Sequence, residues 1–221
     1  MTNSITAVMW DLGGVVLAFD ESITDRKLSA HCALTPEQIS GKLFGNSVAG
    51  REFNEGLIEP FYLGRIGAQV FYQNVKKELG LDMSYKQFVD AWTDIFTRNE
   101  KIIEFMQGLK RKGVPQCALS STNELHMEKM VKFAGLEETV GRARFVTTYN
   151  VGAKKPDRRL FEAATCVLQT PLNQCAYVDD IQKYIDASLK YGIGAAIHVN
   201  ITQPDFQERC IADLKKLGIC A

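Results

Sequence analysis

The strongest constraint on the fold is an alternation of short apolar segments with amphipathic ones along the second half of the chain. Helical periodicity is expected over residues 101–112, 124–134, 158–168 and 181–191, and short strands over 116–119, 144–148, 174–178 and 195–199. A further apolar, β-rich run at 5–10 ends at Asp11 and a Gly-Gly turn. Strands and helices that alternate at this spacing build βαβ units and hence a parallel sheet. We predict an α/β fold with a doubly wound, Rossmann-like parallel sheet.

The stretch between the first strand and residue 97 has a different pattern. Thr35 and Pro36 form a helix start, with proline at the first helical position, and apolar side chains at helical spacing continue as far as Gly80. No strand is expected between residues 22 and 96. The pattern predicts a core domain of residues 1–17 and 97–221, with a helical cap of residues 18–96 inserted into it.

Charge and cysteine usage limit the partners and the compartment. Lys plus Arg and Asp plus Glu each number 26, so the formal net charge is zero, whereas a nucleic-acid binder usually has a basic excess. No apolar run reaches the roughly 20 residues of a transmembrane helix, and residues 1–10 lack the pattern of a signal peptide. The six cysteines include no Cys-x-x-Cys pair. We expect a cytoplasmic protein with reduced cysteines that binds a small molecule and neither nucleic acid nor membrane; the oligomeric state is left open.

Polar side chains follow the predicted strands where ligands bind in open α/β sheets, beyond the carboxyl ends of the strands. These side chains are a single carboxylate, a hydroxyl-rich stretch, a lysine pair and a carboxylate pair: Asp11, Ser120-Ser121-Thr122-Asn123, Lys154-Lys155 and Asp179-Asp180. Because Pro156 favours an extended conformation of the residue before it, Lys155 is the better candidate of the two lysines, and Lys154 is expected to face solvent.

This set of groups fits metal-assisted phosphoryl transfer through an aspartyl intermediate. A carboxylate that attacks an anionic phosphate meets like-charge repulsion, which a Mg²⁺ ion held by neighbouring carboxylates offsets. An ammonium group and a hydroxyl group, such as those of Lys155 and Ser120, can hold the phosphoryl oxygens. Covalent catalysis by Asp11 would complete the reaction.

The ordered motifs Asp11-Leu12-Gly13-Gly14-Val15-Val16, Ser120, Lys155-Pro156 and Asp179-Asp180 resemble those of the haloacid dehalogenase-like (HAD) hydrolase superfamily over the whole chain. Within it, the chain is similar to sugar-phosphate phosphatases of the alpha-glucose-1-phosphate phosphatase type and, more distantly, to the phosphatase-like N-terminal domain of soluble epoxide hydrolase. The resemblance implies a Mg²⁺-dependent phosphohydrolase of small phosphorylated metabolites, with sugar phosphates favoured.

The resemblance also implies a role for each motif residue. Asp11 would be the nucleophile and a Mg²⁺ ligand, together with the Gly13 carbonyl group and Asp180, with Asp179 as a supporting or alternative ligand. Ser120 and Lys155 would bind the phosphate and assist catalysis. Ser121 and Asn123 would contact the substrate or its loop, and three residues of the cap could meet the rest of the substrate: Arg51, Tyr62 and Arg65.

Two positions depart from the superfamily pattern. Gly13 stands where most of its phosphatases have an aspartate that acts as general acid and base, and Tyr184 stands where an asparagine is common. Two alternatives therefore stay open: a haloacid dehalogenase that uses Asp11 on carbon, or a catalytically impaired relative that binds a phosphorylated ligand or a protein. None of the three histidines is assigned a role.

Overall fold

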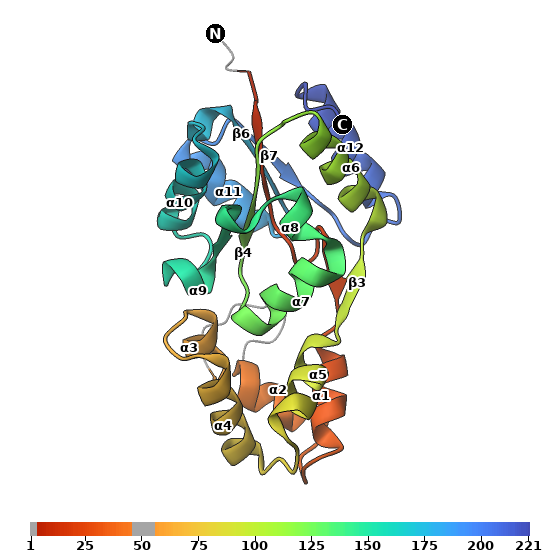
Figure 1. Cartoon of the computed structure of the whole chain (residues 1–221), viewed down its shortest axis with the longest axis vertical. Helices are drawn as coiled ribbons and strands as arrows, with labels where there is room; N and C mark the ends of the chain where they lie inside the picture. Colours follow the sequence, from red (N-terminus) through yellow and green to blue (C-terminus); the bar gives the residue numbers. More distant parts are fainter. Residues whose placement is uncertain (1–3, 46–55) are drawn as a thin grey trace.

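The computed structural model describes residues 4–45 and 56–221 (Figure 1). A five-stranded sheet has the order β5-β4-β1-β6-β7, and every neighbouring pair is parallel. Its strands are β1 (Ala7–Trp10), β4 (Gln116–Ser120), β5 (Phe145–Thr147), β6 (Cys175–Asp179) and β7 (Ala195–His198). The chain builds outward from β1 to β5 and then returns to the other side of β1. The predicted doubly wound α/β sheet is confirmed, and its ligand-binding crevice is expected beside β1.

Helices cover both faces of the sheet because side chains alternate along each buried strand. Val8 and Trp10 pack in one apolar cluster, against α6 (Glu100–Arg111), α7 (Glu124–Ala134), α8 (Leu136–Thr139) and α12 (Phe206–Lys216). Ala7 and Met9 pack in another, against α10 (Arg158–Leu168) and α11 (Gln182–Tyr191). Figure 1 shows α10 and α11 on one side of the sheet and α6 and α12 on the other. Three short helical turns complete this part: α9 (Thr148–Val151), η1 (Arg142–Arg144) and η2 (Leu172–Gln174).

The remaining helices pack on one another around a separate apolar cluster at one end of the molecule (Figure 1). They are α1 (Ser22–Ser29), α2 (Pro36–Phe44), α3 (Glu59–Tyr62), α4 (Ala68–Leu79) and α5 (Tyr85–Thr93), and we call them the helical segment. Thr35 caps α2, and Gly80 ends α4 in the left-handed conformation, as the sequence predicts. Phe71, Phe88 and Trp92 form the aromatic centre of the cluster.

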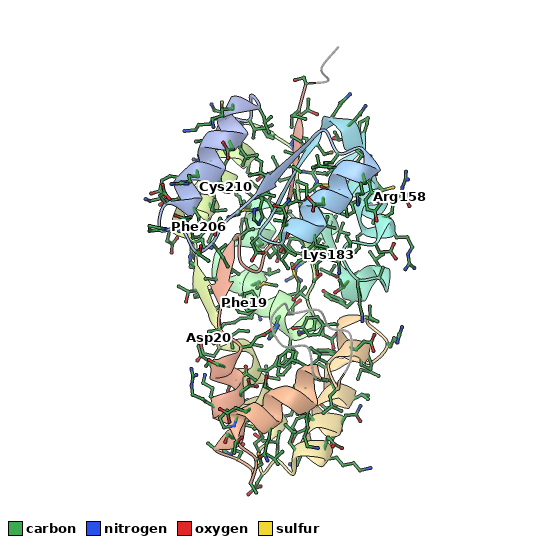
Figure 2. All side chains as sticks on the ribbon, turned by 180° about the vertical axis from the view of Figure 1, so that it is seen from behind. Phe19, Asp20, Arg158, Lys183, Phe206 and Cys210 are labelled. Atoms are coloured by element: carbon green, nitrogen blue, oxygen red, sulfur yellow. The ribbon has the colours of Figure 1, made fainter. Side chains whose placement is uncertain are left out.

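The sequence predicts no strand between residues 22 and 96, and in the described part of that stretch only Phe96 belongs to one; two short strands that the sequence did not predict flank it. β2 (Leu17–Phe19) pairs antiparallel with β3 (Phe96–Arg98), so that a two-stranded ribbon carries the chain into and out of the helical segment. Each strand has three residues, too few for an alternating pattern to be visible in the sequence. The ribbon places Phe19 opposite Phe96, where the helical segment meets the sheet (Figure 2).

None of the helices in the described ranges is both long enough and apolar enough to span a lipid bilayer. All six cysteines are free thiols.

Candidate active site

The predicted side chains converge at the carboxyl edge of the sheet. Asp11 directly follows β1, Ser120 and Asp179 are the last residues of β4 and β6, and Lys155 lies in the loop between α9 and α10. These loops and the helical segment enclose a cavity. Its described lining is Asp11, Gly13, Phe19, Glu21, Tyr62, Ile95, Phe96, Ser120, Ser121, Thr122, His126, Met130, Lys155, Asp180, Ile181 and Tyr184.

A buried charge cluster forms the floor of the site. The Lys155 Nζ atom lies 3.0 Å from Asp11 Oδ1 and 2.7 Å from Asp179 Oδ2, and neither Lys155 nor Asp179 exposes any of its side chain. Burial alone would lower the pKa of Lys155, but the charges of Asp11 and Asp179 outweigh it and raise the pKa above its ordinary value. Lys155 is therefore a permanent cation held against Asp11.

The surroundings of Asp11 strongly shift the pKa of its carboxyl group. Burial raises its pKa well above the ordinary value; Lys155 opposes this shift, and the neighbouring Asp179 and Asp180 add to it. The backbone N–H of Leu12 donates a 2.8 Å hydrogen bond to Asp11 Oδ1 and fixes the carboxylate. Three carboxylates around one point repel each other, so a bound cation would stabilise the ionised form of Asp11.

The geometry separates the two aspartates after β6. Asp179 Oδ2 accepts hydrogen bonds from Lys155 and from the Tyr177 hydroxyl, and Asp179 Oδ1 accepts from the Ile181 N–H at 2.8 Å. Asp180, in contrast, lines the cavity. Asp179 is thus engaged in holding Lys155, while Asp180 faces the ligand space.

The residues present fit a divalent cation with oxygen ligands. Asp11, Asp179 and Asp180 can each offer one oxygen, with these atoms within 4.8 Å of one another. Gly14 has a φ of +90°, and a Cβ atom there would overlap the Asp180 carboxylate. Only glycine at position 14 therefore lets Asp180 approach Asp11 so closely.

The hydroxyl-rich stretch after β4 divides into two parts. Ser120, which is buried, and Ser121 line the cavity. Asn123 does not line it: its side chain caps α7 by accepting the His126 N–H at 3.0 Å, and its Nδ2 lies 3.1 Å from His126 Nδ1. Asn123 therefore fixes the start of α7 next to the cavity.

Sequence reasoning assigned no role to His126, yet its buried ring lines the cavity. The ring stacks on Trp92, with centroids 5.3 Å apart, and Nε2 lies 2.9 Å from the Trp92 carbonyl oxygen. Burial lowers the pKa of His126 to about 4. The spacing Asn123-x-x-His126, one turn into a helix, is the only sequence signal that could have pointed to it.

The expectation that Lys154 faces solvent is wrong. Its Nζ atom pairs with Glu59 Oε1 of α3 at 2.6 Å, and both side chains are about 30% exposed. Of the three residues proposed to meet the substrate from the cap, Tyr62 lines the cavity, Arg65 is exposed and outside the lining, and Arg51 lies outside the described residues.

The two departures from the superfamily pattern have local structural partners. A Cβ atom on Gly13 would lie 2.9 Å from the Phe19 ring, so the aromatic side chain fills the space beside position 13. The Tyr184 ring centroid lies 5.1 Å from Lys155 Nζ, so the ring makes a cation–π contact with the lysine.

Comparison with known proteins identifies the family of this chain. The model of the haloacid dehalogenase-like hydrolases matches residues 5–187, and the chain therefore belongs to this family. Among curated proteins it is similar to Phosphatase MT3486 of Mycobacterium tuberculosis, 21% identical over 220 residues that cover 97% of this chain and 96% of that protein.

Solved structures share the fold. The HAD family enzyme bt-2542 of Bacteroides thetaiotaomicron has a TM-score of 0.76 at 18% identity, over 91% of this chain and 97% of that one. The same enzyme has been solved in complex with magnesium and inorganic phosphate. A HAD-like family hydrolase from Porphyromonas gingivalis has a TM-score of 0.75 at 16% identity, over 97% of this chain and 98% of that one.

Proposed function

We propose that this hydrolase is a Mg²⁺-dependent phosphatase of small phosphorylated metabolites, with sugar phosphates as the favoured class. The observation that carries the proposal is the Asp11 carboxylate, held between the Leu12 N–H and Lys155 at the end of the central strand, with Asp180 beside it. The phosphatase MT3486 and the magnesium and phosphate complex of bt-2542 support it by similarity. The sugar-phosphate preference rests on the motif resemblance.

In the proposed reaction, the Asp11 carboxylate attacks phosphorus. An Asp11–phosphorus bond forms, the ester bond breaks, and the leaving oxygen departs with its electron pair and takes a proton from water. Water then attacks the aspartyl phosphate, which releases phosphate and regenerates Asp11. Lys155 and Ser120 donate hydrogen bonds to the phosphoryl oxygens as charge moves onto them.

Asp11, Asp180 and the Gly13 carbonyl group are the proposed ligands of the metal, and Asp179 orients Lys155. When bound, Mg²⁺ supplies positive charge that lets two anions approach each other. The helical segment closes the cavity as a cap, because Tyr62 of that segment and Ile95, just after it, line the same space as Asp11. This closure would limit the access of bulk water.

The test is phosphate release from sugar phosphates and an aryl phosphate, with and without Mg²⁺. We expect the Asp11→Asn variant to lose at least about 10³-fold in rate, because the nucleophile is removed. Asp213→Asn, which changes a half-buried residue of α12 far from the cavity lining, is the matched control and should retain full activity.

Metal-independent release of halide from haloacids would instead support the dehalogenase alternative. Phosphate release at the same rate from wild type and Asp11→Asn would refute the proposal.

A further inference from the structure

Asn99 occupies the capping position of α6, yet its side chain does not cap the helix. It lies between β3 and α6, where the chain returns from the helical segment to the sheet region (Figure 1). An asparagine at such a position normally accepts a hydrogen bond from an N–H of the first helical turn. The Asn99 side chain makes no such bond, and the Lys101 N–H of that turn donates instead to Gln207 Oε1 of α12 at 3.1 Å. The Asn99 side chain therefore serves a different contact.

The Asn99 amide group binds the loop that follows Asp11. Its Nδ2 atom lies 2.7 Å from the Val15 carbonyl oxygen and 3.4 Å from the Gly14 carbonyl oxygen, and only 6% of the residue is exposed. Carbonyl oxygens only accept, so both contacts need the two N–H groups of the amide. The Asn99 backbone N–H donates a third hydrogen bond, to the Val16 carbonyl oxygen at 3.2 Å. One residue thus binds three successive carbonyl groups of this loop.

The same loop sets how closely Asp180 lies to Asp11. Gly14 packs against Asp180 so tightly that a Cβ atom at position 14 would lie 2.4 Å from Asp180 Oδ2. The Gly13 carbonyl group belongs to the peptide bond that joins Gly13 to Gly14. A shift of Gly14 would therefore move two of the proposed metal ligands relative to Asp11.

Loss of the Asn99 amide would produce such a shift. The Gly14 and Val15 residues are buried, and a buried carbonyl group without a donor is costly, so the loop would rearrange toward other donors. Asn99 itself lies outside the described cavity lining.

We propose that Asn99 is a positioning residue of the metal site. By holding the Gly14 and Val15 carbonyl groups, it sets the places of Asp180 and of the Gly13 carbonyl group beside Asp11. Because Asn99 directly follows β3, it also ties the ribbon of the helical segment to this loop. The inference rests on the metal site of the proposed function and adds to it a residue that lies outside the motifs.

The test is isothermal titration calorimetry of Mg²⁺ into the substrate-free protein, which measures metal affinity without turnover. Asn99→Ser removes the amide donors, and serine is favoured at a helix N-terminus as much as asparagine is. The dissociation constant of Mg²⁺ should rise about tenfold, as expected when a group that supports metal ligands is lost. Ser84→Ala, which removes the side-chain cap of α5, is the matched control: it also weakens a helix start but should leave the Mg²⁺ dissociation constant unchanged.

Asn99→Asp is the second variant, and it keeps the inference testable if Asn99→Ser does not fold. Its carboxylate has the size of the amide but only accepts, so it cannot donate to the Gly14 and Val15 carbonyl groups. The added negative charge by itself favours cation binding. Weaker Mg²⁺ binding by Asn99→Asp, which we expect, would therefore come from the displaced loop.

An unchanged Mg²⁺ dissociation constant in folded Asn99→Ser, or unchanged or tighter Mg²⁺ binding by Asn99→Asp, would overturn the inference alone. Weaker Mg²⁺ binding by both variants, with no phosphate release by wild type, would support the inference while the proposed function fails. Absence of Mg²⁺ binding by wild type would overturn the proposed metal site and the inference with it.

Discussion

Acidification should destabilise the protein through His126, whose ring is buried between the sheet region and the helical segment. Its pKa falls from an ordinary 6.5 to about 4 in the folded state. The unfolded chain therefore binds the proton more tightly, and stability is lost as the pH falls through this range. One pKa unit corresponds to about 1.4 kcal/mol. Protonation of His126 should therefore lower the free energy of unfolding by about 2 kcal/mol between pH 7 and pH 5, and by about 3 kcal/mol in total below pH 4.

The assay is urea unfolding of wild type and His126→Asn at pH 7 and pH 5, followed by tryptophan fluorescence. Burial raises the pKa of Asp25 to about 6, a shift of opposite sign that partly masks the effect in wild type. Both proteins keep Asp25, so the difference between their pH dependences isolates His126. His31→Asn is the control and should behave as wild type. If wild type and His126→Asn lose the same free energy on acidification, the reasoning is refuted.

Two further substitutions test the charge cluster. Gly14→Ala should displace Asp180 and raise the Mg²⁺ concentration for half-maximal activity by about 10–100-fold. Gly113→Ala is the control, because Gly113 also has a positive φ but has open space where its Cβ would lie, and it should leave this concentration unchanged. Equal effects of the two substitutions in a Mg²⁺ titration would contradict this role for Gly14. Lys155→Met should abolish turnover and lower the free energy of unfolding by about 3–5 kcal/mol, because Asp179 would lose its buried cation. A fully stable Lys155→Met variant in urea unfolding would show that the cluster relaxes or takes up a proton.

The sheet and its helices could be predicted because their signals are local. The expected helices at 124–134 and 158–168 coincide with α7 and α10, since apolar periodicity and flanking Asn123 and Asp157 caps lie in the same stretch of chain. β2 and β3 could not be predicted, because each exists only through pairing with the other across the whole helical segment.

The same distinction between local signals and long-range contacts applies to the site. Asp11, Ser120 and Asp179 could be found because each ends or directly follows a strand, and a parallel sheet brings such ends together. His126 and Lys154 acquire their roles from contacts with the helical segment, through the Trp92 carbonyl group and Glu59, and no local pattern encodes that docking.

The absence of an acidic side chain at position 13 is matched by the packing around that position. Phe19 occupies the space beside Gly13 and faces Phe96 across the ribbon, with ring centroids 6.3 Å apart. Phe96 in turn makes a T-shaped contact with His126. A side chain at position 13 would require the Phe19 ring to shift, so an aspartate there needs local repacking. The ribbon that joins the helical segment to the sheet thus also places aromatic rings beside the point where the proposed leaving group departs.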